Sequence, residues 1–367
     1  MDEEKSVALL NVRNLRTHFD TDAGVARAVD GVSFAMQQGE CVALVGESGC
    51  GKSVTALSIM RLLPVPPARI ASGRILWQGR NLLELPEPEM CQVRGARIAM
   101  VFQEPQSALN PVFTSGNQVA EAYLTHQLAA AKREAWERAV DSLRAVGIPD
   151  PARRALDYPH QLSGGMKQRI CIAMSLICSP RLLIADEPTT ALDVTIQAQI
   201  LELLSRLQRE RGLALLLITH DLGIVAEMAA RVFVMYAGKV VESARTEDLF
   251  NLPMHPYTQG LMRARPEPGG RRRGRQRLAV IPGMVPAATQ FRDDCRFRPR
   301  CPRADGKCFA EPPLVELRPG HCVACWHPCD AGQDAWGQGP ASGRRPASEA
   351  RGDSAGTGSA SPEGGRP

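Results

Sequence analysis

The stretch Cys41-Val-Ala-Leu-Val-Gly-Glu-Ser-Gly-Cys-Gly-Lys-Ser53 decides the fold. Its first five residues are apolar and predict a short buried strand. The residues Gly46 to Ser53 fit the pattern G-x-x-x-x-G-K-[ST]. After them, Lys52 to Leu63 predicts a helix that Pro64 stops. A strand, a glycine-rich loop and a helix in this order are typical of a site that binds phosphate groups.

Each residue type in this loop has a chemical reason. Glycines allow a positive φ, so that backbone N–H groups can approach phosphate oxygens closely. The start of the helix adds the positive end of its dipole. Lys52 can reach the terminal phosphates, and the hydroxyl of Ser53 can ligate Mg²⁺. The predicted phosphate-binding residues are Gly46, Glu47, Ser48, Gly49, Cys50, Gly51, Lys52 and Ser53.

Working outward from the loop, short apolar strands alternate with helices over the first 260 residues or so, which predicts an α/β fold with a largely parallel sheet. The middle of the chain, about 104–162, lacks strand patterns and reads as a helical insertion. The expected strands are Arg97–Phe102, Leu182–Ala185, Ala214–Ile218 and Val232–Tyr236, and the clearest helices are Lys132–Val146 and Val194–Arg211.

Composition narrows the class of function. Aromatic residues make up only 5% of the 367 residues, which disfavours sheets that stack nucleic-acid bases. The net charge is +5, and much of the excess lies in the run Arg271 to Arg277, so no chain-wide basic surface is indicated. The sequence has no apolar run long enough to span a bilayer and no signal-peptide pattern at its acidic start. We therefore expect a cytoplasmic protein.

Two further motifs supply acidic and phosphate-facing groups. The apolar run from Leu182 ends in Asp186 and Glu187, at the strand end where α/β sheets bind ligands. Asp186 is suited to hold Mg²⁺ and Glu187 to act as a general base on water. Upstream, Leu162-Ser-Gly-Gly-Met166 opens a helix and predicts a second anion cradle at Ser163, Gly164 and Gly165.

The order Gly46–Ser53, Gln103, Leu162–Met166, Asp186-Glu187, Asp193 and His220 resembles the ATP-binding cassette (ABC) ATPases over about residues 7–250. The resemblance implies a P-loop NTPase with a RecA-like, largely parallel core, an antiparallel β subdomain and the helical insertion. It also implies ATP and Mg²⁺ as ligands, and ATP hydrolysis as the activity. Met166 stands where many members have Gln, a variant that resembles the peptide-transporter branch.

The family's roles follow by position. Gln103 would contact Mg²⁺ and water and report to a membrane partner, and His220 would hold the γ-phosphate and the attacking water. Ser163 and its glycines would contact the γ-phosphate bound to the other subunit of a head-to-tail pair, with Asp193 near that interface. Phe19, upstream of the first strand, is a candidate to stack on adenine. The alternative for Phe19 is a core residue at a strand end.

The C-terminal part points to one branch of the family. His255-Pro-Tyr-Thr258 and the cysteines after it resemble the ATPase subunits of oligopeptide, dipeptide and nickel importers, to about residue 328. From the residues alone, four cysteines could enclose Zn²⁺ or an iron–sulfur cluster, or could bind no metal. The resemblance implies a [4Fe–4S] cluster, and Cys322 or Cys329 could replace the fourth ligand. The four positions are Cys295, Cys301, Cys308 and Cys325.

The expected organisation is a nucleotide-binding domain over 1–262, a basic linker over 263–277, a small Cys-rich C-terminal domain over 278–330 and a disordered tail over 331–367. The resemblance implies a peripheral ATPase on the cytoplasmic face of the membrane, powering import of short peptides or of small solutes such as nickel. Its partners would be a second, different cassette subunit, two transmembrane permease subunits and an extracytoplasmic solute-binding protein. The alternatives are a cassette ATPase that acts on nucleic acid, and an exporter or regulatory cassette.

Overall fold

The computed structural model describes residues 8–103, 108–190, 192–264 and 280–336. The expected tail beyond residue 336 and most of the expected basic linker lie outside these residues. A single compact unit contains all the described residues, including those of the Cys-rich segment. None of the helices in the described part of the chain is long and apolar enough to cross a membrane.

The main sheet has eight strands in the order β11-β12-β10-β9-β3-β8-β7-β6. Its five strands from β9 to β6 are parallel, and β10, β12 and β11 continue it in antiparallel fashion. The largely parallel core predicted from the sequence is therefore confirmed. The strands are β3 (Cys41–Val45), β6 (Ile98–Val101), β7 (Leu182–Asp186), β8 (Ala214–Thr219), β9 (Arg231–Tyr236), β10 (Lys239–Arg245), β11 (Val315–Arg318) and β12 (His321–Val323).

A second, antiparallel sheet has the order β2-β1-β4-β5 and confirms the expected β subdomain. Phe19 lies within its first strand rather than upstream of it, opposite Ala26 on one neighbour and Ala68 on the other. The position expected for Phe19 is thus corrected, because the first strand predicted from the sequence was Cys41–Val45, whereas two strands precede it. The strands are β1 (Leu10–Thr21), β2 (Gly24–Met36), β4 (Ala68–Trp77) and β5 (Arg80–Asn81).

Two apolar cores cover the two faces of the main sheet. Along β3, Val42 and Leu44 join the core shared with the antiparallel sheet, whereas Ala43 and Val45 join the core shared with the helices. This alternation is the period of two expected for a strand buried on both faces. The helices of the two cores are α1 (Lys52–Met60), α2 (Glu87–Val93), α8 (Val194–Arg211), α9 (Leu222–Met228), α10 (Thr246–Asn251) and α11 (Pro256–Arg263), with the short 3₁₀ turns η1 (Leu82–Glu84), η3 (Arg298–Arg300) and η4 (Gly306–Phe309).

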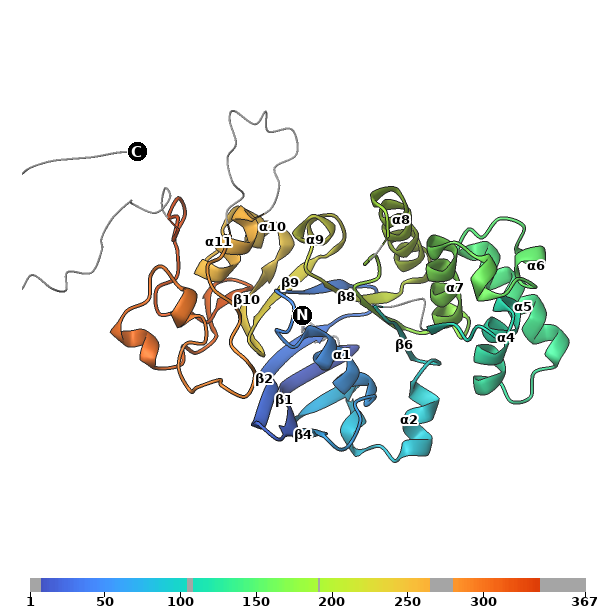
Figure 1. The fold of residues 1–367 in the computed structure, drawn as a ribbon, viewed down its shortest axis with the longest axis horizontal. Helices are drawn as coiled ribbons and strands as arrows, with labels where there is room; N and C mark the ends of the chain where they lie inside the picture. The colour runs from blue at the N-terminus through green and yellow to red at the C-terminus, as the bar shows by residue number, and fades with distance from the viewer. Residues whose placement is uncertain (1–7, 104–107, 191, 265–279, 337–367) are drawn as a thin grey trace, which may run out of the picture. The chain divides into compact units, whose positions relative to one another are not determined.

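The expected insertion is helical, and no strand lies in its described part, 108–162 (Figure 1). Ala135, Ala139 and Leu143 form the buried stripe of one of its helices, with the spacing of a helix face. This stripe packs toward the helix that follows the insertion. The elements of the insertion are α4 (Ser115–His126), α5 (Lys132–Ala145), α6 (Pro151–Arg154) and η2 (Pro159–Gln161), and the helix that follows it is α7 (Gly164–Leu176).

Helix α1 is shorter than predicted. It ends at Met60, because Arg61 adopts a left-handed conformation and its N–H bonds back to Leu57 and Ser58. The guanidinium of Arg61 donates to the carbonyls of Leu82 and Leu85, which fixes this end of the helix. The proline that was expected to stop the helix therefore lies beyond its actual end.

Candidate functional site

The loop Gly46–Ser53 connects β3 to α1 and requires glycine at two points. At Gly46, with φ of 153°, a β-carbon would lie 2.2 Å from the carbonyl oxygen of Met235. At Gly51, with φ of 99°, a β-carbon would lie 2.3 Å from the carbonyl oxygen of Ala28. Both positions thus need a residue without a side chain, as the phosphate-loop pattern demands.

Lys52 is buried beneath this loop. Its ammonium donates to the carbonyl oxygens of Gly46 at 2.8 Å and Glu47 at 3.0 Å. These carbonyls compensate for the loss of water around the charge. The ammonium is therefore held at the centre of the loop, where it can turn to phosphate oxygens that enter it.

Ser53 and Asp186 meet at the carboxyl end of the sheet, as predicted. The Ser53 hydroxyl donates to Oδ1 of Asp186 at 3.1 Å. Burial raises the pKa of Asp186, while the hydrogen bond from Ser53 acts in the opposite direction. A hydroxyl and a carboxylate side by side are oxygen ligands of the kind that Mg²⁺ prefers. The residues present therefore fit a magnesium site.

Glu187 is the meeting point of three elements. Its carboxylate accepts hydrogen bonds from Gln103 Nε2 at 3.1 Å and from the Thr190 hydroxyl at 2.8 Å, and its Oε1 lies 3.2 Å from His220 Nδ1. Burial alone would raise the pKa of Glu187, but the hydrogen bonds from Thr190 and His220, and nearby charges, outweigh it and lower the pKa. The carboxylate is thus ionised and able to accept a proton.

The backbone conformation of Glu187 sets the direction of its carboxylate. Glu187 has φ of 46°, a left-handed conformation that is unusual for a residue with a side chain. Its N–H donates to the carbonyl of Ile218 on β8 at 2.9 Å, which holds the residue in place. Backbone of this kind is concentrated at functional sites.

Ser163 and Asp193 are the N-caps of α7 and α8. The Ser163 hydroxyl accepts from the N–H of Met166 at 3.3 Å, and the Asp193 carboxylate accepts from the N–H of Ile196 at 2.9 Å. At Gly165 a β-carbon would lie 2.7 Å from Cγ2 of Ile196, so the two helix starts pack closely there. These contacts are local, and the expected roles of Ser163, Gly164 and Asp193 toward a partner subunit stay predictions.

Sequence reasoning missed three residues around the site. Thr190 begins the run Thr190-Ala-Leu-Asp193, of which only Asp193 was singled out from the sequence. The hydroxyl of Tyr257 accepts from the N–H of Glu47 at 2.8 Å, and Arg300 pairs with the Glu47 carboxylate. The only sequence signal for Tyr257 was its place in the His-Pro-Tyr-Thr run, and nothing local distinguishes Arg300.

The four cysteines expected to bind a metal are reduced and at least partly buried. Burial, with smaller contributions from neighbouring thiols, raises the pKa of Cys295 to about 11 and that of Cys325 to about 12. The charges of Cys301 and Cys308 act on Cys295, so the thiols are close enough to interact. A bound cation would reverse this preference for the protonated form.

The two cysteines that could replace the fourth ligand, Cys322 and Cys329, differ in their contacts. Cys322 lies on β12, where its side chain bonds to Ser243 on β10, and it takes no part in the group of interacting thiols in the described residues. Cys329 interacts with Cys301 and Cys325 and accepts from Arg303 at 3.1 Å. Both alternatives to the fourth ligand stay predictions.

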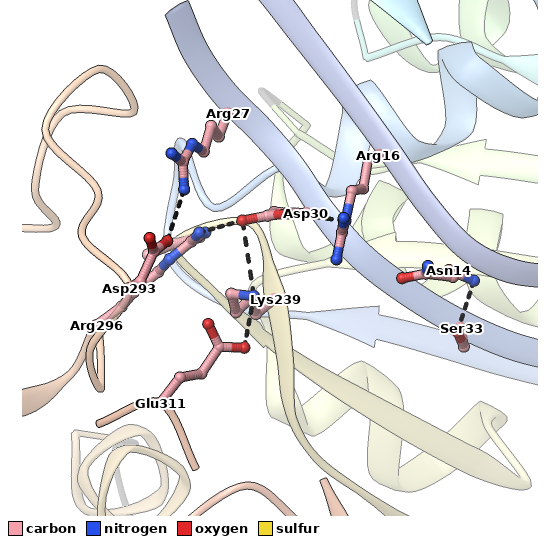
Figure 2. A network of polar contacts seen from close by, with 10 residues as sticks. Asn14, Arg16, Arg27, Asp30, Ser33, Lys239, Asp293, Arg296 and Glu311 are labelled. Atoms are coloured by element: carbon pink, nitrogen blue, oxygen red, sulfur yellow. Dashed lines mark hydrogen bonds and ion pairs between the residues drawn. The ribbon is translucent and has the colours of Figure 1, made fainter. Parts of the chain in front are cut away.

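An ion network that is buried at Asp30 and Arg296 ties the Cys-rich segment to the antiparallel sheet. The Asp30 carboxylate of β2 pairs with Arg16 at 3.2 Å, with Lys239 at 3.6 Å and with Arg296. Figure 2 shows Arg16 and Arg296 reaching Asp30 from opposite sides. Lys239 also pairs with Glu311 at 2.7 Å, which brings a second acidic group into the network. The segment is thus joined to the nucleotide-binding part by charge as well as by packing.

Comparisons with known proteins agree with this geometry. A family model described as ABC transporter matches residues 29–190, and one described as the C-terminal region of oligopeptide/dipeptide transporters matches residues 241–308. The chain is 55% identical over 324 residues to the "Probable peptide ABC transporter ATP-binding protein y4tR" of Sinorhizobium fredii, covering 88% of this chain and 96% of that one.

It is also 49% identical over 325 residues to the dipeptide transport ATP-binding protein DppD of Escherichia coli, covering 88% and 98% of the two chains. Among solved structures, the ATP-binding cassette MJ0796, a dimer in a post-hydrolysis state bound to ADP and Pi, is similar with a TM-score of 0.58 and 27% identity. That match covers 65% of this chain and 98% of the cassette. The names of these matches refer to transporters and cassettes and give no support to an ATPase that acts on nucleic acid.

Proposed function

The chain belongs to the ABC transporter family, as an ATP-binding subunit of its peptide-importer branch, and we propose that it hydrolyses ATP to power import of short peptides or of related small solutes such as nickel. One observation carries the catalytic part of this proposal. The Glu187 carboxylate, with Gln103 and His220 bonded to it, follows directly after Asp186, which bonds to Ser53 of the phosphate loop. Base, metal ligands and phosphate loop thus converge on one end of the sheet.

The proposed reaction is attack of water on the γ-phosphate. The lowered pKa of Glu187 keeps its carboxylate ionised near neutral pH, so it can take a proton from water as the oxygen bonds to phosphorus and the bond to ADP breaks. His220 and Gln103 contact the same carboxylate and would orient this water. Mg²⁺ held by Ser53 and Asp186, with Gln103 nearby, would supply positive charge to the phosphates.

We propose that the second half of each ATP site comes from a partner cassette in a different chain. Ser163, Gly164 and Gly165 would bind the γ-phosphate held by the partner, with Asp193 at the interface. Ser163 and Asp193 lie at helix starts, where unsatisfied N–H groups and the helix dipole favour an anion. The dimeric state named for the similar cassette MJ0796 supports such a pair.

The membrane partners would be two permease subunits that dock on the helical insertion. Two apolar side chains support this, because Val112 is 68% exposed and Phe113 is 50% exposed just before α4. Substrate would arrive from an extracytoplasmic binding protein and would not contact this chain. The subunit would then work at the cytoplasmic face of the membrane, as a peripheral protein.

We further propose that Cys295, Cys301, Cys308 and Cys325 hold a [4Fe–4S] cluster. In a tetrahedral zinc site with Zn–S bonds of about 2.3 Å, sulfurs lie about 3.8 Å apart. In the described residues, the one group of metal-binding atoms all within 4.8 Å of one another is Asp305, Cys308 and His327, and no three thiols lie that close. The four cysteines belong to one segment, and each is at least partly buried, which supports a group held among them.

The first test is ATP hydrolysis by membranes that hold the reconstituted complex. Wild type and Glu187→Gln are compared, each with and without a peptide-loaded binding protein. We expect stimulation by the loaded protein in the wild type and a loss of at least about 100-fold in the variant. Full activity of the variant would refute Glu187 as the base. Hydrolysis that is indifferent to every binding protein would refute the importer function.

A further inference from the structure

An arginine of the Cys-rich segment pairs with a residue of the phosphate loop far away in the sequence. Arg300 Nη1 lies 2.7 Å from one carboxylate oxygen of Glu47, and its Nη2 lies 3.1 Å from the other. The two bonds form a bidentate pair, the arrangement that fixes both distance and orientation. The Arg300 side chain is only 5% exposed, so water competes little for this pair.

The segment presents this guanidinium in a fixed position. Arg300 Nε donates to the carbonyl of Pro282 at 2.9 Å, and Nη2 donates to that of Ile281 at 3.3 Å. The Tyr236 hydroxyl lies 3.5 Å from Nη1. These contacts, to backbone carbonyls and to a tyrosine hydroxyl outside the loop, fix the guanidinium independently of Glu47.

Glu47 is in turn held through all of its polar groups. Its N–H donates to the Tyr257 hydroxyl at 2.8 Å, and its carbonyl accepts from Lys52 Nζ at 3.0 Å. The Arg300 pair adds the side chain. Glu47 follows directly after Gly46, the entry to the loop, so its position decides where the next N–H groups of the loop point.

Charge gives the pair a second consequence. Glu47 places a carboxylate within a loop whose ligand carries several negative charges. Two like charges in a partly buried site repel by roughly 1 kcal/mol or more at separations of several ångströms. Arg300 supplies the compensating positive charge. Without it, the loop would carry an uncompensated negative charge beside the phosphates.

We propose that Arg300 is a positioning residue for ATP binding, through which the Cys-rich segment orders the phosphate loop and neutralises Glu47. The Cys-rich segment is then part of the nucleotide site. This inference rests on the ATP-binding role of the loop, but it does not depend on what the four thiols bind.

The test is equilibrium binding of a fluorescent ATP analogue with Mg²⁺ to the full-length chain, together with KM and kcat of the assembled transporter. We expect Arg300→Gln to raise the Kd and KM about tenfold with a smaller change in kcat. Arg300→Lys, which keeps the charge, should recover part of the affinity. Adding Glu47→Gln to Arg300→Gln should recover most of it, because the unpaired charge is removed. Arg298→Gln is the matched control, since Arg298 belongs to the same turn but pairs with Asp294.

Three outcomes would overturn the proposal: an Arg300→Gln protein with the wild-type Kd, equal losses for Arg300→Gln and Arg298→Gln, or no recovery in the double variant. The melting temperature is measured for each variant. If Arg300→Gln does not fold, Glu47→Asp takes its place, because it keeps both charges but withdraws the carboxylate by one methylene. We then expect a three- to fivefold higher Kd as an order of magnitude, and an unchanged Kd would refute the proposal. Binding of the ATP analogue by the wild-type chain tests the ATP-binding role of the loop separately from the role of Arg300.

Discussion

Gln103 Nε2 lies 3.1 Å from the carboxylate of Glu187, although 84 residues separate them in the chain. The contact forms because Gln103 follows β6 and Glu187 follows β7, and these strands are parallel neighbours. Gln103 directly precedes the helical insertion. One hydrogen bond therefore links the start of the insertion to the proposed catalytic base, Glu187.

The first prediction uses this contact. Gln103→Glu places a like charge beside Glu187, which raises the pKa of Glu187 and reduces its ionised fraction. Because the pKa of Glu187 starts below its usual value, we expect the slower hydrolysis on the acid side of the profile, with recovery as the pH rises, measured as a pH–rate profile from about pH 5 to about 9. Gln103→Leu, which adds no charge, is the control and should keep the wild-type pH dependence. Identical profiles for the two variants would contradict the prediction.

The second prediction compares two loop glycines. Gly46→Ala must displace the backbone of Met235 and the thiol of Cys50, which would lie 2.2 and 2.8 Å from the new carbon. Gly49 also has a positive φ, but nothing lies within 4 Å. We expect Gly46→Ala to lose about 3 kcal/mol or more of unfolding free energy together with ATP binding. Gly49→Ala should lose only about 1 kcal/mol. Urea unfolding measures both, and equal losses would show that crowding is not the cause.

The third prediction concerns His255, the buried N-cap of α11, whose Nδ1 accepts from the N–H of Tyr257 at 3.0 Å. Burial lowers the pKa of His255 to about 4, against an opposing effect of Glu242. The unfolded chain binds this proton below about pH 6.5, whereas the folded chain does not until about pH 4. Stability from this group is therefore complete above pH 6.5 and is lost as the pH falls toward 4, by about 3 kcal/mol.

His255→Asn keeps a capping acceptor but does not titrate. We expect the unfolding free energy of the variant, followed by urea unfolding from about pH 7 to about 4, to fall less than that of the wild type by about 3 kcal/mol. Parallel curves for the two proteins would refute the role of His255, because the other groups titrate in both.

The fourth prediction concerns the network of Figure 2. Asp30→Asn leaves three cations without their shared carboxylate, whereas Arg296→Leu leaves Asp30 still paired with Arg16 and Lys239. We expect losses of about 3–5 kcal/mol for Asp30→Asn and about 1–3 kcal/mol for Arg296→Leu. Guanidinium unfolding of both variants and their combination gives the coupling energy. A larger loss of unfolding free energy for Arg296→Leu than for Asp30→Asn would contradict the central role of Asp30 in the network.

The fifth prediction tests the proposed cluster. Chain purified without oxygen should contain about four iron and four sulfide ions, which Cys301→Ser should lose. Cys322→Ser is the matched control, because Cys322 faces Ser243 and should not affect the metal content. Elemental analysis and the visible absorption spectrum report the outcome. Stoichiometric zinc in place of iron, or full iron content in Cys301→Ser, would rule out the assignment.

The sequence predicts the phosphate loop and the parallel strands well, because their signals are local. Cys41–Val45 is an apolar run that ends at a glycine, and Asp186 and Glu187 end another such run. The structure confirms both strands, and it also brings Gln103 and His220 to Glu187, a contact that the family pattern did not specify. In these cases a motif and the strand before it determine the position.

The remaining contacts depend on pairings that local patterns do not encode. Arg300 and Glu47 are 253 residues apart, and neither lies in a pattern that names the other. The strand that contains Phe19 was not predicted, because β1 alternates irregularly, with register shifts against both of its neighbours. The helix α1 ends at the left-handed Arg61, which no sequence pattern indicated. The only sequence signal for the end of this helix was Pro64, three residues later.

The last strand of the main sheet along the chain, β12, pairs with β10, and its first residue, His321, bonds to the buried Glu242, 79 residues earlier. During translation at 5–20 residues per second, this closure is delayed by about 4–16 seconds after β10 has been made. In that interval, the edge of β10 that pairs with β12 stays open, and Glu242, whose carboxylate accepts from the N–H groups of Met254 and His255, lacks its His321 partner. An exposed edge can pair with another chain. In the finished subunit β12 pairs with this edge of β10, so the exposure of the edge to other chains is confined to the time before β12 is made.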